Sequence, residues 1–153
     1  MNSGMLLRAV NLHKVFLNGG RKSEVLKGID IEIKKEEIVS LIGPSGAGKS
    51  TLLYLLAGLD TPTAGEVWFE DGNLYGLRDE ERARLRNERF GFVFQFYNLL
   101  PEFTALENVM IPGWINRKDR KMEAAGFLKE VGLAERLTHR PPELSGGEQQ
   151  RVA

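Results

Sequence analysis

The chain has 153 residues, of which 21 are Lys or Arg and 21 are Asp or Glu, so its formal net charge is zero. This balance argues against a basic nucleic-acid-binding tail and a polybasic membrane anchor, and the lack of cysteine excludes disulfides and thiolate metal sites. Residues 1–5 lack the basic and apolar regions of a signal peptide, and no apolar run approaches the ~18 residues of a membrane span. The sequence therefore predicts about one domain, soluble and intracellular, in which any membrane role comes through a partner.

The first third of the chain has the pattern of a β-sheet. Residues 6–16 alternate apolar and polar side chains, a turn follows at residues 17–22, and residues 24–26 and 28–33 again resemble strands. The three isoleucines of the last stretch share one face, and its acidic residues share the other. We therefore expect an antiparallel sheet with one solvated face.

One aromatic side chain of this region has two interpretations. The spacing of Phe16 favours a core residue, and the alternative is a platform for adenine, because aromatic rings stack on any base. His13 and His139 have no partner at metal-ligand spacing, so we interpret both as ordinary polar residues.

Residues 43–50, GPSGAGKS, fit the phosphate-binding pattern G-x-x-x-x-G-K-[ST]. The apolar run before them, residues 38–42, predicts a strand buried on both faces, and residues 50–57 predict a helix that ends at Gly58. Glycines let the backbone approach phosphates with inward-pointing N–H groups, and the helix adds the positive end of its dipole. The flanking strand and helix disfavour the alternative, a chance glycine-rich turn.

The loop therefore predicts a nucleotide site that binds ATP with Mg²⁺. Lys49 should reach the β- and γ-phosphates, and the Ser50 hydroxyl should coordinate Mg²⁺. The predicted nucleotide-binding residues of this stretch are Gly43, Pro44, Ser45, Gly46, Ala47, Gly48, Lys49, Ser50 and Thr51.

A hairpin and a charged helix are expected next. Residues 61–65 predict a turn, residues 66–70 a strand, and residues 71–73 the end of a hairpin. Residues 79–88 carry Arg and Glu at helical spacings, which favours a solvated helix over a nucleic-acid patch.

A second buried strand is predicted at residues 90–94, and Gln95 follows it directly. Ligands in open α/β sheets bind beyond the carboxyl ends of strands, so Gln95 could approach Mg²⁺ or orient a water. Its neutral amide is no general base. By itself, a Gln at a strand end is usually a loop residue.

Two helices are predicted in the last third. A capping box at residues 104–107 opens a helix that should end before Pro112. A second helix is expected over residues 119–131, with Gly132 as its end. The expected apolar face of this helix is Met122, Ala125, Phe127, Leu128 and Val131.

Residues 144–151, LSGGEQQR, form a second potential anion site. Ser145 fits the N-cap of a helix, and the glycines Gly146 and Gly147 would leave backbone N–H groups open to an anion.

Together, GPSGAGKST, FVFQ and LSGGEQQ occur in the order and rough spacing of the ATP-binding-cassette (ABC) transporter ATPases, which the chain resembles over nearly its whole length. The stretch FGFVFQFYNLLPEFTALENV resembles the lipoprotein-release and macrolide-export branch. The resemblance implies an α/β fold: a P-loop NTPase core with an N-terminal antiparallel β subdomain and an α-helical subdomain. Residues 1–94 would hold the β subdomain and core strands, residues 95–144 the glutamine loop and helical subdomain, and residues 145–153 the signature.

By this resemblance, Phe16 is the aromatic residue that stacks on adenine, which reverses the preference from spacing. Gln95 senses Mg²⁺ together with Ser50 and faces the membrane partner. The signature contacts the γ-phosphate of an ATP held by the opposite subunit. Its residues are Leu144, Ser145, Gly146, Gly147, Glu148 and Gln149.

The function implied is an ATPase subunit that dimerises head to tail around two ATPs with Mg²⁺ and drives an integral-membrane permease. The permease would dock on residues 103–137 and hold the subunit at the inner face of the cell membrane, with no nucleic-acid partner. One alternative is a cell-division or regulatory ATPase that signals through a permease-like partner without transport. The other, a DNA-repair ATPase, is disfavoured because Ser50 and Ser145 lie close in sequence, with no coiled-coil heptads between them.

The sequence departs from the family pattern in three places. Glu36 replaces a usual Gly, which questions a turn, and Ala47 replaces a frequent Ser. Beyond Ala153 the family carries an Asp that holds Mg²⁺, a Glu that polarises water, a switch His and further core strands. We therefore expect part of a longer protein, exposed apolar edges at residues 38–42 and 90–94, and no meaningful ATP hydrolysis by this chain alone.

Overall fold

The structure is a computed structural model that describes residues 4–153. It divides into two compact units, Met1–Phe90 and Gly91–Ala153. The expected lack of a signal peptide concerns residues 1–5, of which the first three lie outside the described part. Within residues 4–153, no helix combines the length and the apolar character needed to cross a bilayer. The functional subdivision at residues 94 and 144 stays a prediction.

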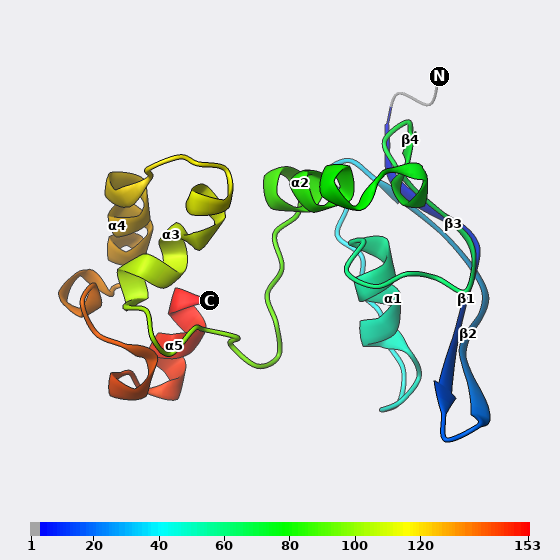
Figure 1. The fold of residues 1–153 in the computed structure, drawn as a ribbon, viewed down its shortest axis with the longest axis horizontal. Helices are drawn as coiled ribbons and strands as arrows, with labels where there is room; N and C mark the ends of the chain where they lie inside the picture. Colours follow the sequence, from blue (N-terminus) through cyan, green and yellow to red (C-terminus); the bar gives the residue numbers. More distant parts are fainter. Residues whose placement is uncertain (1–3) are drawn as a thin grey trace. The chain divides into compact units, whose positions relative to one another are not determined.

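The first unit is built on a four-stranded antiparallel sheet (Figure 1). Its strands are β1 (Met5–Asn18), β2 (Arg21–Lys34), β3 (Ala64–Phe69) and β4 (Gly72–Asn73), in the order β2-β1-β3-β4. The predicted hairpins are therefore confirmed. The two expected pieces of β2 form one continuous strand.

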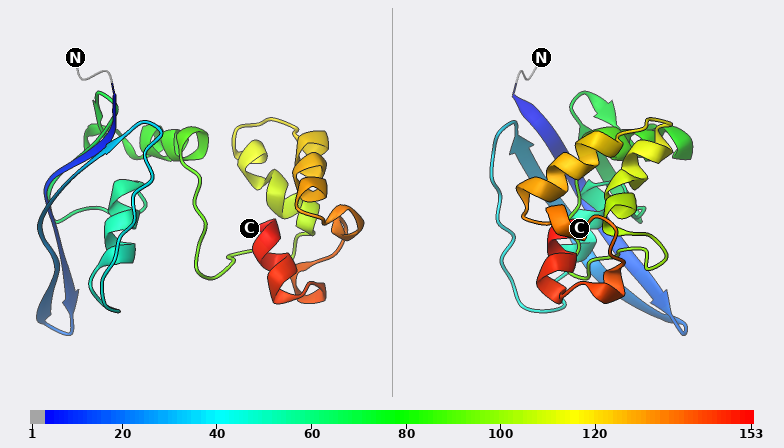
Figure 2. Two further views of the ribbon diagram at one scale, coloured as in Figure 1. Left: turned by 180° about the vertical axis from the view of Figure 1, so that it is seen from behind. Right: turned by 90° about the vertical axis from the view of Figure 1, so that its left-hand side faces the viewer.

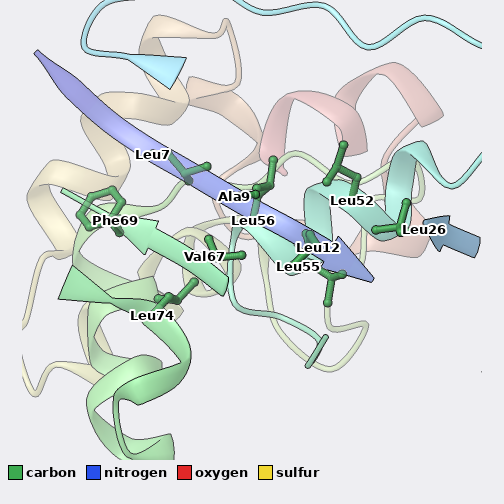
Figure 3. Packing of buried hydrophobic residues seen from close by; sticks show 10 residues of the cluster. All are labelled: Leu7, Ala9, Leu12, Leu26, Leu52, Leu55, Leu56, Val67, Phe69 and Leu74. Atoms are coloured by element: carbon green, nitrogen blue, oxygen red, sulfur yellow. The ribbon is translucent and has the colours of Figure 1, made fainter. Parts of the chain in front are cut away.

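The helix α1 (Lys49–Leu56) packs against one face of this sheet (Figures 1 and 2). Leu52, Leu55 and Leu56 of α1 are buried in one cluster with residues of β1, β2 and β3 (Figure 3). At about 25 cal/mol per Å² of apolar area, this burial is the main force that fixes α1 on the sheet. The sheet residues of the cluster are Leu7, Ala9, Leu12, Leu26, Val67 and Phe69. The alternation predicted for β2 is confirmed, since its isoleucines pack against this cluster and its acidic residues are exposed.

The predicted solvated helix is also confirmed. α2 (Asp79–Arg89) follows the short 3₁₀ turn η1 (Leu74–Gly76) and has no buried residue. Within η1, the Tyr75 hydroxyl lies 2.6 Å from the carbonyl oxygens of both Leu55 and Asp60. Burial raises the pKa of this hydroxyl, so Tyr75 stays a neutral donor that holds the chain after α1.

Two predicted strands are wrong. Residues 38–42 and 90–94 form no strand, and the side chains of Ile38 and Ile42 are 95% and 94% exposed. A strand needs a neighbour that accepts and donates its backbone hydrogen bonds. The sheet of the described residues runs from β2 to β4 and contains neither stretch.

The second unit consists of short helices. They are α3 (Ala105–Ile115), α4 (Lys121–Glu130), η2 (Ala134–Arg136), η3 (Pro141–Glu143) and α5 (Gly146–Val152). Figure 2 shows α5, drawn in red, beside the other helices of this unit in both views. The buried cluster that joins them is Ala105, Leu128, Leu133, Leu144 and Val152.

The capping box that opens α3 is confirmed, but the expected end before Pro112 is wrong. Thr104 accepts from the Glu107 N–H, and the Glu107 carboxylate accepts from the Thr104 N–H at 2.8 Å. The helix passes through Pro112 and ends at Ile115. The turn beyond Pro112 is held by its packing, because the Trp114 ring meets the Phe103 ring edge-on at 5.9 Å.

The predicted apolar face of α4 is confirmed at Leu128 and is otherwise too wide, and the helix itself and its end at Gly132 are confirmed. Ala124 and Leu128 are its buried residues, whereas Met122 is 87% and Phe127 53% exposed. Residues four apart lie on one narrow stripe of a helix, so the buried surface of α4 is centred on that stripe.

Candidate nucleotide-binding site

The glycine-rich loop runs directly into α1. Gly48 is the N-cap of this helix, with φ of 84° and ψ of 9°. A Cβ at Gly48 would lie 2.9 Å from Val25 Cγ1 and 3.0 Å from Leu26 Cδ2. Such contacts and the positive φ both require glycine here. The loop therefore lies against β2.

Lys49 folds back over the loop. Its Nζ donates to the carbonyl oxygens of Gly43 at 2.8 Å and Pro44 at 2.7 Å. Both acceptors are neutral carbonyl oxygens, whereas a phosphate oxygen carries negative charge and adds Coulomb attraction to the hydrogen bond from the ammonium. An incoming polyphosphate would therefore compete well for this ammonium.

The surroundings of the loop fit an anion. No side chain caps the N-terminus of α1, and its first turn has no acidic residue. Residues 43–47 are exposed, and a Cβ built on Gly46 meets no atom within 4 Å. Unsatisfied N–H groups and the positive end of the helix dipole favour negative charge at such a position. Ser50 is exposed and Thr51 half-buried beside them.

Phe16 lies on the part of β1 that is near the loop. Lys14 pairs with Leu26 of β2, the residue that contacts Gly48, and Phe16 is two residues further along β1. Its side chain is 40% exposed, so the core interpretation from spacing is wrong. The structure brings Phe16 and the glycine loop to the same end of the first unit.

Gln95 belongs to the second unit, where it is exposed in a bend. Ser50 belongs to the first unit. Within residues 4–153, no three or more Asp, Glu or His side chains form a group suited to a metal. The joint role of Ser50 and Gln95 toward Mg²⁺ stays a prediction.

The signature opens α5 with a capping box. The Ser145 N–H donates to Glu148 Oε2 at 2.8 Å, and the Glu148 N–H donates to Ser145 Oγ at 3.3 Å. The bonds from the Ser145 N–H and hydroxyl, with one from Arg136, lower the pKa of Glu148 to about 2. Ser145 and the two following glycines are exposed, whereas Leu144 is buried. Gln149 Nε2 donates to the Pro141 and Leu144 carbonyl oxygens at 2.9 and 3.0 Å.

Sequence reasoning missed several supporting residues. Arg136 Nε donates to Glu148 Oε1 at 3.0 Å, and a Cβ on Gly146 would lie 3.3 Å from the Tyr97 hydroxyl. Neither contact has a sequence signal. Buried Asn108 has one, because it is a polar residue inside the apolar run of α3. The fourth missed residue is Lys14 of β1, whose Nζ donates to Asp60 Oδ1 at 2.8 Å and to the Thr61 carbonyl oxygen at 2.7 Å.

The two histidines lie outside the loop. His13 contacts Asn11 Oδ1 at 3.1 Å and Glu24 Oε1 at 3.4 Å. His139 Nδ1 is buried, and no hydrogen-bond partner lies among the described residues.

Comparison with known proteins identifies the family. Residues 26–153 match the family described as ABC transporter. The chain belongs to this ABC transporter family. The resemblance seen in the motifs is thereby confirmed.

Individual ABC relatives are closely similar. The lipoprotein-releasing system ATP-binding protein LolD of Hydrogenovibrio crunogenus is 51% identical over 99% of this chain and 67% of the relative. LolD of Myxococcus xanthus is 51% identical over 97% of this chain and 67% of its own length.

A solved ABC structure shares the fold. It is described as a dimeric post-hydrolysis state of the ATP-binding cassette MJ0796 bound to ADP and Pi, with a TM-score of 0.89 and 39% identity. It is matched over 96% of this chain and 66% of its own chain. The predicted α/β ABC ATPase fold is confirmed, and this chain spans about two thirds of the length of the relatives it matches.

Proposed function

We propose that this chain is the ATP-binding part of an ABC transporter subunit that serves a lipoprotein-releasing system. The observation that carries the proposal is the glycine loop on β2, with Lys49 over it and α1 uncapped behind it. The lipoprotein-releasing role rests on the identity of about half of the residues shared with LolD proteins.

In this proposal Lys49 and the first turn of α1 bind the phosphates, and Phe16 stacks on the adenine. Ser50 and Gln95 would contribute oxygen ligands to Mg²⁺, which, when bound, offsets the negative charge of the phosphate oxygens. Exposed Ser50 presents the hydroxyl that such a contact needs. Phe16 is 40% exposed, so a base can reach part of its side chain.

The signature would complete the site of a second subunit in a head-to-tail dimer. The exposed Ser145, Gly146 and Gly147 support this role, because an anion can reach the backbone there. The dimeric description of the MJ0796 structure supports the assembly.

A permease would dock on the second unit and hold the subunit at the inner membrane face. Apolar side chains that are exposed there support this role, since such surface is typical of interaction sites. These are Phe96, Leu100, Trp114, Ile115, Met122 and Phe127. Within this unit, an apolar hollow of about 460 Å³ is lined by residues that include Phe92, Phe94, Val109 and Ile111.

The test of ATP binding replaces Lys49 by alanine. Removal of a charge-assisted phosphate contact of roughly 1.5–3 kcal/mol should raise the dissociation constant for ATP about 10- to 150-fold. Isothermal titration of the 153-residue chain measures this change, and Lys27→Ala, at an exposed residue of β2, is the matched control. Equal affinities for Lys49→Ala and the unmodified chain would disprove the phosphate site.

A second experiment tests the partner. Solubilised membranes from the native organism, purified on this protein, should yield an integral-membrane permease together with a lipoprotein cargo. A permease recovered without lipoprotein would favour the regulatory alternative.

A further inference from the structure

We propose that Lys14 is a positioning residue for the base of the nucleotide: its anchored ammonium fixes the Phe16 ring from one face and leaves the other face for a purine. This inference rests on the proposed function. It concerns a residue that no motif of the sequence singles out.

Lys14 is tightly held although it lies on a sheet. Its Nζ donates to Asp60 Oδ1 at 2.8 Å and to the Thr61 carbonyl oxygen at 2.7 Å, and Asp60 Oδ2 is also 2.7 Å away. The Lys14 side chain is 11% exposed. A cation in this position has little rotamer freedom left.

Asp60, the partner of this cation, is also held by hydrogen bonds. Burial opposes ionisation of Asp60, yet the hydrogen bonds from Lys14 and the Thr61 N–H and the charge of Lys14 outweigh it and hold its pKa below the usual value. The Asp60 carbonyl oxygen lies 2.6 Å from the Tyr75 hydroxyl. The segment after it is bound to β1, where Thr63 Oγ1 accepts from the Val15 N–H at 2.9 Å.

The same ammonium lies 5.0 Å from the centroid of the Phe16 ring. This is within the ~6 Å at which a cation is attracted by the negative face of an aromatic ring. The attraction holds the ring in one orientation. It also draws π-electron density toward Lys14, which reduces the repulsion between the opposite ring face and the π-face of a purine.

The geometry therefore links three groups in series: Asp60 holds Lys14, Lys14 holds Phe16, and Phe16 meets the base. Lys14 does not touch the phosphate loop in this series. Its loss should weaken the binding of a ligand that has a base, and leave a ligand made only of phosphates unaffected.

The experiment compares ATP with inorganic tripolyphosphate on the 153-residue chain by isothermal titration. Lys14→Met keeps an unbranched side chain and removes the charge. It should raise the dissociation constant for ATP roughly three- to tenfold and change that for tripolyphosphate by less than about twofold. The exposed Lys27→Met is the control and should change neither, while Lys14→Arg should restore the affinity for ATP, because guanidinium also binds ring faces.

A double-mutant cycle separates positioning from a general structural effect. If Lys14 acts through Phe16, then Lys14→Met should have no added effect on ATP binding in a Phe16→Leu background. Because Lys14→Met leaves the Asp60 carboxylate unpaired, Lys14→Met/Asp60→Asn is measured in parallel and should show the same selective loss.

Each other outcome overturns the inference. The inference fails if Lys14→Met weakens the binding of ATP and tripolyphosphate equally. It also fails if the effect of Lys14→Met adds fully to that of Phe16→Leu, or if ATP binding is unchanged in both Lys14→Met and Lys14→Met/Asp60→Asn. Failure of the proposed function gives a different result, since the unmodified chain would then bind neither ATP nor tripolyphosphate.

Discussion

Replacing Asn108 by alanine should release the segment that precedes α3. Asn108 is 9% exposed, and its amide lies within hydrogen-bond distance of four backbone groups. Oδ1 accepts from the Leu100 N–H at 2.8 Å. Nδ2 lies 3.1, 3.1 and 2.9 Å from the carbonyl oxygens of Leu100, Phe103 and Thr104.

The magnitude follows from these contacts. At a net value of about 1 kcal/mol for each bond, four bonds give an upper estimate of about 4 kcal/mol. Leu100 is exposed, so water can replace part of what its backbone loses. One amide nitrogen also has only two N–H groups for three carbonyls. We therefore expect the free energy of unfolding of the second unit to fall by about 2–3 kcal/mol.

Urea unfolding followed by circular dichroism measures this loss, and hydrogen exchange at the Leu100 N–H locates it. Gln150→Ala, which removes an exposed amide from α5 of the same unit, is the control and should change stability by less than about 0.5 kcal/mol. Asn108→Asp keeps the acceptor for Leu100 and places a carboxylate against three carbonyl oxygens, so its stability should increase as the pH falls. Unchanged protection of the Leu100 N–H in Asn108→Ala would refute the reasoning.

Two further predictions concern other parts of the chain. Gly65 has φ of 89°, and a Cβ there would lie 2.2 Å from the Asn11 carbonyl oxygen. Gly65→Ala should therefore destabilise the first unit by more than about 3 kcal/mol in thermal unfolding, and a melting temperature equal to that of Gly72→Ala, where a Cβ meets its nearest atom at 3.7 Å, would contradict this. The pKa of Glu148 is lowered from 4.5 to about 2 by its bonds to Ser145 and Arg136. Its contribution to stability is thus present above about pH 4.5 and lost as the pH falls through about 2. The chemical shift of the Glu148 N–H should follow that titration, and a midpoint near 4.5 would show that the capping box is absent in solution.

The hairpins and most helix boundaries could be predicted because their signals are local. The alternation of β2, the turn residues of β3 and β4, and the Thr104 and Ser145 N-caps each act within a few residues. The glycine loop could be predicted for the same reason, because its sequence pattern reflects the left-handed backbone conformation that Gly48 adopts.

The wrong predictions depend on distant partners. Residues 38–42 have the composition of a buried strand, but the sheet of the described chain offers them no neighbour. The helical period predicts an apolar face of five residues on α4, whereas the buried residues of this helix are Ala124 and Leu128. Composition tells which side chains gain from burial, and it does not tell which surface is there to bury them.

The position of Lys14 shows how the two halves of a nucleotide could be held at a fixed separation. The N-terminal end of α1 is fixed to β2, because Gly48 lies against Val25 and Leu26. The chain beyond the C-terminal end of α1 is fixed to β1, because Asp60 binds Lys14. The helix α1, packed on the sheet through Leu52, Leu55 and Leu56, therefore connects the phosphate loop to the anchor of the Phe16 ring. A change in the packing of Leu55, which is buried in the second turn of α1, should shift the two contacts together, so its effect on ATP binding should exceed its effect on tripolyphosphate binding.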